Sequence, residues 1–156
     1  MHEDRDTMAL DRRGFVAAGV ALITTTALFG ASAKAGLPEV EAAIAEIVGG
    51  GSSQEGRITL DLPEIAENGN TVPLTVEVES PMTEDDYVKA VHLFADGNPV
   101  PTVATMNFTP RSGEAVASTR IRLAKTQKIH AVAEMSDGSF FTAAQEVKVT
   151  IGGCGG

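Results

Sequence analysis

Large aliphatic side chains occupy every second position of Val72-Pro73-Leu74-Thr75-Val76-Glu77-Val78, and the polar Thr75 and Glu77 lie between them. Successive side chains of a β-strand point to opposite faces of its sheet, so this pattern predicts a strand with one buried and one exposed face. An α-helix would instead repeat its apolar residues every three or four positions. The segment therefore predicts a sheet with a hydrophobic core on one side.

Similar runs lie on both sides of this segment, and turn signals separate several of them. Asn68-Gly69, Asp96-Gly97 and Asp137-Gly138 are typical of tight turns between strands. About seven short strands at this spacing predict a mainly β fold, an immunoglobulin-like antiparallel β-sandwich. The Cys-Trp-Cys core of true immunoglobulin domains is absent. The other expected strands are Ile58–Leu62, Val88–Ala95, Val103–Phe108, Ala115–Leu123, Gln127–Met135 and Phe140–Val149.

One short amphipathic helix is expected before the strands, from Leu37 to Val48. Pro38 lies in its first turn, where the missing backbone N–H would have no helical partner anyway. Residues 49–53, Gly-Gly-Gly-Ser-Ser, should end this N-terminal helix and form a flexible link to the strands. Apolar residues recur at helical spacing at Val40, Ile44, Ile47 and Val48.

The first 35 residues are typical of an export signal. Arg12 and Arg13 lie in Asp11-Arg12-Arg13-Gly14-Phe15-Val16, a twin-arginine pattern, and an apolar run to Phe29 follows. This run is shorter than the ~20 apolar residues of a membrane span, and small residues near Ala33 fit a cleavage site. We therefore expect residues 1–35 to be a twin-arginine signal peptide that directs the chain to the periplasm. Residues 36–150 are expected to form one domain.

The only cysteine, Cys154, stands between two pairs of glycines in Ile151-Gly152-Gly153-Cys154-Gly155-Gly156. Glycine has no Cβ, so residues 151–156 are expected to be a flexible C-terminal arm. The three residues from Ile151 to Cys154 reach about 10 Å when extended. A lone exposed thiol is accessible to chemical reaction, so Cys154 is the candidate reactive residue. A frayed tail without a role is the alternative.

The remaining chemical candidates carry weaker signals. His92 and His130 each lie inside an expected strand, where a single histidine is usually structural. Glu84-Asp85-Asp86 lacks the alternating oxygen ligands of calcium loops and is expected to be a solvated acidic loop. Three methionines are expected in the core and two arginines on an exposed strand face; they are Met82, Met106, Met135, Arg120 and Arg122.

Charge and missing motifs narrow the class of partner. The formal net charge is −9, which argues against nucleic acid and anionic membranes as partners. No CxxC pair, phosphate-binding glycine loop or HExxH motif occurs, so neither a cofactor nor a metal is expected. Twin-arginine export carries folded cargo, and a co-exported partner subunit would explain its use here.

An exported β domain that ends in Gly-Gly-Cys-Gly-Gly resembles the SoxY family, the sulfur carriers of bacterial thiosulfate oxidation. The resemblance extends over nearly all residues after the signal, including Asp61–Ala66. It implies that Cys154 holds sulfur covalently, first as an S-thiosulfonate and then as a persulfide. It also implies a carrier rather than an enzyme. The carrier arm would include Gly152, Gly153, Gly155 and Gly156.

The same resemblance implies a set of protein partners. A SoxZ-like subunit would form a heterodimer or a larger assembly with this chain. The haem-containing SoxAX would join thiosulfate to Cys154, and SoxB, a metal-dependent hydrolase, would release sulfate. In some systems a SoxCD-type sulfur dehydrogenase would oxidise the remaining persulfide.

Two other functions are compatible with parts of the sequence. An exported immunoglobulin-like interaction module could use Cys154 for an intermolecular disulfide. A ubiquitin-like carrier would use the carboxylate of Gly156, but it needs ATP and a different fold. A stand-alone cysteine enzyme is disfavoured because no histidine lies near the arm in the sequence to activate the thiol.

Overall fold

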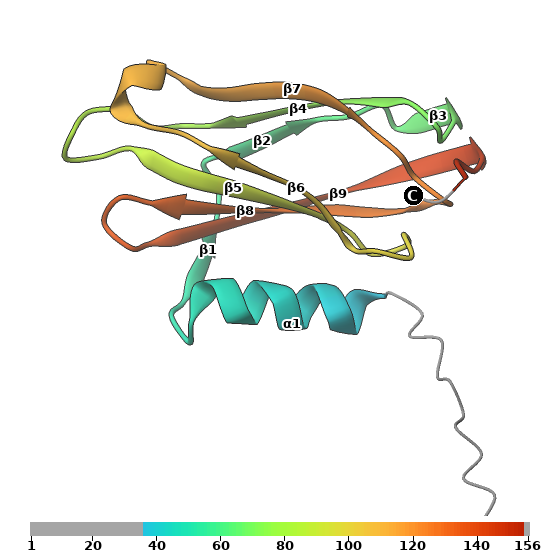
Figure 1. The fold of residues 1–156 in the computed structure, drawn as a ribbon, viewed down its shortest axis with the longest axis horizontal. Helices are drawn as coiled ribbons and strands as arrows, with labels where there is room; N and C mark the ends of the chain where they lie inside the picture. Colours follow the sequence, from blue (N-terminus) through green and yellow to red (C-terminus); the bar gives the residue numbers. More distant parts are fainter. Residues whose placement is uncertain (1–35, 155–156) are drawn as a thin grey trace, which may run out of the picture. The chain divides into compact units, whose positions relative to one another are not determined.

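The fold was taken from a computed structural model, which describes residues 36–154. These residues form one α-helix, one short 3-10 helix and nine strands (Figure 1). The predicted helix is confirmed with the same limits, α1 at Leu37–Val48. The strands are β1 Ser53–Glu55, β2 Ile58–Asp61, β3 Ile65–Asn68, β4 Val72–Val78, β5 Val88–Ala95, β6 Thr102–Asn107, β7 Ala115–Ile121, β8 Gln127–Met135 and β9 Phe140–Ile151, and the 3-10 helix η1 is Pro110–Ser112.

The strands form two facing sheets, as expected for a β-sandwich (Figure 1). The larger sheet has the order β1-β9-β8-β5-β6, and β3 pairs with β9 as well. The smaller sheet has the order β2-β4-β7. In the smaller sheet β4 lies in the centre, and its residues 72–78 pair antiparallel with residues 121–115 of β7. The segment with the clearest alternation is therefore the central strand of its sheet.

Two strands depart from the expected antiparallel arrangement. Both β1 and β3 pair with β9 in the parallel direction. Ser53 was expected to lie in a flexible link, yet it pairs with Phe140 at the start of β9. At the other end, β9 continues past its last β8 partner, Gln127, and there it pairs with β3. These two strands are only three or four residues long, so alternation had too few positions to reveal them.

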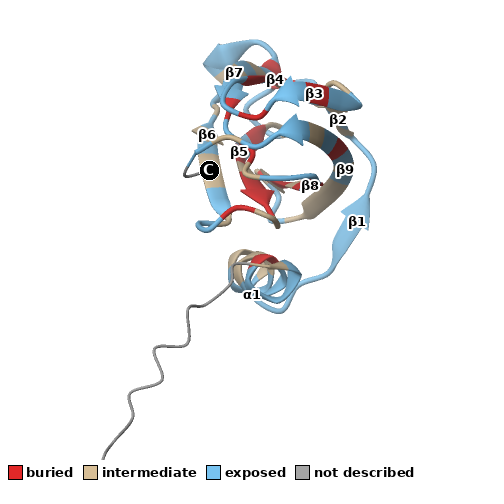
Figure 2. Cartoon of the chain, turned by 90° about the vertical axis from the view of Figure 1, so that its right-hand side faces the viewer, coloured by how far each residue is buried: buried red, intermediate tan, exposed pale blue. Residues whose placement is uncertain are grey.

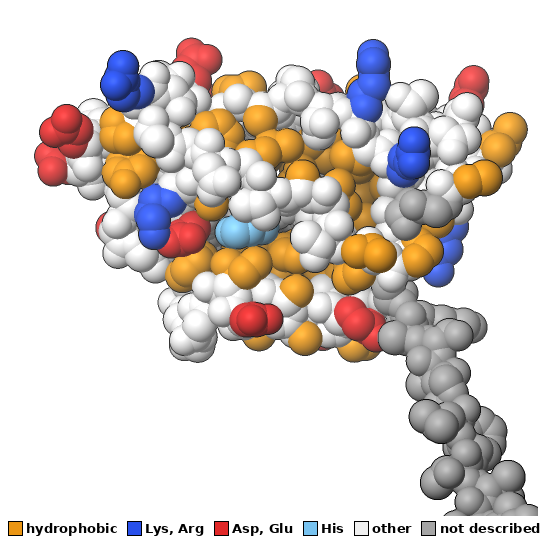
Figure 3. All heavy atoms as spheres, in the orientation of Figure 1, with side chains coloured by type: hydrophobic (Ala, Val, Ile, Leu, Met, Phe, Trp, Pro, Cys, Tyr) orange, Lys and Arg blue, Asp and Glu red, His pale blue; other side chains and the backbone are white. Residues whose placement is uncertain are grey.

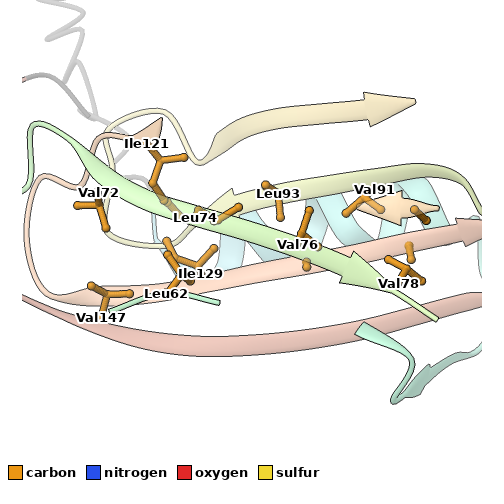
Figure 4. Packing of buried hydrophobic residues seen from close by; sticks show 14 of the residues in the cluster. Leu62, Val72, Leu74, Val76, Val78, Val91, Leu93, Ile121, Ile129 and Val147 are labelled. Atoms are coloured by element: carbon orange, nitrogen blue, oxygen red, sulfur yellow. The ribbon is translucent and has the colours of Figure 1, made fainter. Parts of the chain in front are cut away.

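The core lies between the two sheets. The apolar face of β4 is buried, with Leu74 1% and Val76 0% exposed, whereas Glu77 on the other face is exposed. Figure 4 shows these side chains against those of Leu93 in β5 and Ile129 in β8. Burying each such side chain contributes about 1.5–3 kcal/mol. The two sheets are thus held together mainly by hydrophobic contact.

Methionines fill part of the same core. Met82 and Met135 are buried, and the partly exposed Met106 packs against the cluster. The sequence-based expectation that these side chains are core residues is confirmed.

Helix α1 forms a third layer on the outer face of the larger sheet (Figure 2). Its Val40 is fully buried against Phe94 of β5 and Val132 of β8. Gly49 ends the helix in a left-handed conformation with φ 62°, and its N–H donates to Ala45 O. Within residues 36–154, no helix is both long and apolar enough to cross a bilayer.

Leu74→Ala should destabilise the sandwich by about 2–5 kcal/mol, because it removes core contacts and leaves a cavity. Glu77→Ala, on the exposed face of the same strand, is the matched control and should change stability by no more than about 0.5 kcal/mol. Urea unfolding followed by circular dichroism measures both. Equal effects would contradict the orientation of β4.

Candidate functional site

The end of β9 is fixed to the body by backbone hydrogen bonds. Gly69 donates its N–H to Ile151 O at 2.7 Å, and Leu123 donates to Gly69 O at 2.8 Å. Gly153 then donates to Leu123 O at 2.8 Å. Three chain segments that are distant in the sequence therefore meet at one place, where β9 ends and the arm begins.

One side chain continues this network to the cysteine. The backbone N–H of Cys154 donates to Asn70 Oδ1 at 3.1 Å. Both the backbone N–H and the side-chain Nδ2 of Asn70 donate to Asn68 Oδ1, at 2.9 and 3.0 Å. These two bonds fix the orientation of the Asn70 amide, so that its oxygen faces Cys154. We call residues 68–70 together with 123–124 the arm-binding surface.

The glycines are required here because the backbones approach closely. A Cβ on Gly152 would lie 2.1 Å from Ala124 O, and one on Gly153 would lie 2.7 Å from Gly69 O. A Cβ on Gly69 would lie 2.2 Å from Leu123 O. All three distances are shorter than real Cβ contacts, and the obstacle in each case is backbone. Any larger residue at these positions would push the arm away from the body.

The sequence-predicted arm is only partly described by the structure. Residue 151, assigned to the arm, belongs to strand β9, so the arm leaves the sheet one residue later than expected. Cys154 is exposed and its thiol is free. Gly155 and Gly156 lie outside the described residues, as do the signal residues Arg12 and Arg13.

The sequence profile described as "Sulfur oxidation protein SoxY" matches residues 44–154, which is most of the chain and ends at the cysteine. The chain belongs to the SoxY family. The sulfur carrier protein SoxY from Chlorobium limicola f thiosulfatophilum has a similar structure, with a TM-score of 0.62 and 36% sequence identity. The match covers 73% of this chain and 98% of that protein.

More distant structures share the fold of this SoxY-family chain. The superoxide reductase (neelaredoxin) from Ignicoccus hospitalis has a TM-score of 0.54 at 18% identity, over 60% of this chain and 80% of its own. A putative superoxide reductase from Thermotoga maritima has a TM-score of 0.53 at 20% identity, over 62% and 87%. At this identity the similarity shows the fold alone. A comparison with curated proteins found no match.

A buried polar pair supports the arm-binding surface of this SoxY-family chain. Asn98, 4% exposed, donates from Nδ2 to Arg122 O at 2.8 Å and accepts from the N–H of Ala124 at 3.0 Å. Gln127 donates to the same Asn98 oxygen at 2.8 Å. Because Asn98 holds both sides of Leu123, it fixes the carbonyl that receives the Gly153 N–H. Neither Asn98 nor Asn70 was predicted as a site residue, because Asn68-Gly69 and Asp96-Gly97 carry only turn signals in the sequence.

The two arginines lie beside a groove between the sheets. Arg120 and Arg122 are exposed while Ile121 and Leu123 are buried, which confirms the expected alternation. Figure 3 shows the molecule from the same side as Figure 1, and hydrophobic side chains are visible there between the charged ones. The groove lies where edge strands β6 and β7 are not paired. Its volume is about 300 Å³, and its lining is Asn98, Val100, Thr102, Val103, Ala104, Thr119, Arg120, Ile121 and Arg122.

The acidic loop and the histidines make contacts of their own. Asp86 donates its N–H to Thr83 Oγ1 and accepts from the N–H of Thr83, which closes the loop on itself. Among residues 36–154, no three acidic, histidine or cysteine side chains are grouped so as to hold a metal ion. His130 Nε2 lies 3.3 Å from Asp96 Oδ2, and His92 Nδ1 lies 3.1 Å from Thr105 Oγ1.

The half-buried His92 should make stability depend on pH. Burial lowers the pKa of His92 below its ordinary value of 6.5, and the charge of Glu134 opposes this in part. The unfolded chain then binds the proton more readily, so this contribution to stability is present above pH 6.5 and is lost as the pH falls through the lowered pKa. His92→Gln should make the free energy of unfolding depend less on pH in this range. Urea unfolding at pH values from about 5 to about 8 tests this; parallel profiles for both proteins would contradict it.

Proposed function

We propose that this chain is a sulfur carrier of thiosulfate oxidation, which holds its cargo covalently on Cys154. The observation that carries the proposal is an exposed, free thiol at the end of β9, in a chain of the SoxY family. The similar Chlorobium protein is itself described as a sulfur carrier protein.

The proposed cycle uses the cysteine sulfur as the attachment point. In the first step, the thiol of Cys154 and thiosulfate together would lose two electrons to the SoxAX haem proteins, and the thiol proton would pass to water. A sulfur–sulfur bond forms and gives the S-thiosulfonate. In the second step, SoxB adds water to the terminal sulfone, which leaves as sulfate with two protons, and a persulfide remains on Cys154.

The carrier itself would supply presentation rather than catalysis. Within the described residues, the hydrogen bonds of residues 152–154 go to the backbone carbonyl of Leu123 and to the side chain of Asn70, and none goes to a histidine or a carboxylate. A nucleophilic enzyme would need a neighbouring base to activate its thiol. Activation would therefore come from the partner enzyme, which keeps the carrier unreactive between partners.

The proposal includes a location and a partner. The twin-arginine pattern at Arg12 and Arg13 supports export to the periplasm. Export in the folded state would bring a SoxZ-like subunit along with this chain. An interaction module with an intermolecular disulfide at Cys154 is the alternative function, since a free terminal thiol would serve that purpose as well.

Intact mass spectrometry of the protein from thiosulfate-grown cells, before and after reductant, separates the two functions. A sulfur carrier should show additions that match thiosulfate or sulfane sulfur, and reductant should remove them. Cys154→Ser is the matched control and should carry none. A disulfide dimer without any sulfur addition would favour the interaction module.

A bulky side chain beside the cysteine should hinder entry of the arm into a narrow partner cleft. Gly155→Val should therefore lower kcat/KM with the SoxB hydrolase while the unfolding midpoint stays unchanged. The measurement compares sulfate release from the loaded carrier with urea unfolding of the same protein. An unchanged kcat/KM would argue against threading of the arm.

A further inference from the structure

The arm of a carrier must leave the body, yet here its first residues are bound to it. Gly153 donates to Leu123 O and Cys154 donates to Asn70 Oδ1. Full extension of the three residues after Ile151 would reach about 10 Å, but only once both bonds are broken. The structure therefore shows a docked arm, and delivery requires an undocked one.

We propose that Asn70 is a positioning residue, which keeps the arm docked on the body and so sets the fraction of carrier ready to enter a partner. The arm is docked when both hydrogen bonds are made and undocked when both are broken. This inference rests on the proposed function, since only a carrier has to deliver its thiol. It concerns the arm-binding surface, residues 68–70 and 123–124.

The two hydrogen bonds of the docked arm are weak enough to break and re-form reversibly. One net hydrogen bond changes such an equilibrium by about 3- to 10-fold. Two such bonds favour the docked arm by roughly 10- to 100-fold, and the entropy regained when residues 152–154 are released opposes this preference. The docked and undocked forms therefore lie close enough in free energy to exchange without an external energy source.

The docked contacts do not involve the sulfur. Cys154 is held through its backbone N–H, and its side chain is exposed. A thiol, a thiosulfonate and a persulfide therefore leave the same two hydrogen bonds intact. Docking is independent of the load, so the arm returns to one resting position at every stage of the cycle.

The close backbone contacts give two glycines a role in docking. Gly152 and Gly153 lie where a Cβ would meet Ala124 O and Gly69 O. Substitution there disturbs the docked form itself. These two positions act on docking in addition to any effect on entry into a partner cleft.

The first test measures docking without any sulfur chemistry. Amide hydrogen exchange is followed by NMR in the full chain, purified with any subunit that accompanies it, on a Cys154→Ser background. The informative amide is that of Gly153, because it bonds to Leu123 and not to Asn70. Asn70→Ala should speed its exchange by about 3- to 10-fold. The Gly69 amide, which bonds to Ile151 at the end of β9, should not change.

Matched variants separate positioning from a general loss of structure. Asn107→Ala removes the same type of side chain at the last residue of β6 and should leave the exchange rate of the Gly153 amide unchanged. Asn68→Ala should act like Asn70→Ala, because it frees the Asn70 amide to turn. Asn68→Asp keeps an acceptor for both Asn70 donors and should preserve slow exchange. Equal Gly153 exchange in Asn70→Ala and Asn107→Ala would overturn the proposal.

A second test links docking to delivery. With a SoxB-type hydrolase and the thiosulfonate-loaded carrier, Asn70→Ala should lower KM by about the same 3- to 10-fold and leave kcat unchanged, because more of the arm is ready to bind. An unchanged KM together with faster Gly153 exchange would overturn the gating role. If the chain carries no sulfur at all, the proposed function fails, whereas the exchange result still decides whether Asn70 docks the arm.

Discussion

The burial of one face of β4 is the interaction on which the rest of the structure depends. Val72, Leu74, Val76 and Val78 close the space between the sheets, and neither sheet would keep its place without this contact. This burial also affects the arm, because Gly69 and Asn70 lie in the turn before β4, and Leu123 lies two residues after β7, the strand that pairs with β4. Core packing therefore aligns the loop ends that receive the arm, and hydrogen bonds then fix it locally.

The site is assembled mainly from backbone. Gly69 and Leu123 contribute N–H and carbonyl groups, Gly153 contributes its N–H, and Cys154 donates its N–H to the side chain of Asn70. Backbone groups of the body bind a glycine-rich arm through contacts that need little space. The buried Asn98–Gln127 pair holds the Leu123 segment in turn. The thiol of Cys154 is thus placed on the surface, where the partner enzymes of the proposed cycle would reach it.

Much of this was predictable from the sequence, for clear physical reasons. Alternation over seven residues defined β4, helical spacing gave α1 its limits, and the family resemblance was confirmed. The parallel strands β1 and β3 were missed because they are too short to show a period. Asn70 was missed because its partner, Cys154, is 84 residues away, and only the fold brings them together. The glycine-rich ending predicted conformational freedom of the arm. The close backbone approach at Gly152 shows that glycine also allows the arm to bind to the body.

The parallel pairing of β3 with β9 has a mechanical meaning. Residues 148–151 of β9 lie alongside Ile65–Asn68, just before the arm begins. Under the proposed carrier function, a partner would pull on the arm along the direction of β9, and the force would act parallel to these strands and load their hydrogen bonds in shear. The bonds would then share the load, whereas peeling would break them one by one. A partner that drew the cysteine inward would therefore extend the glycines without separating β9 from β3.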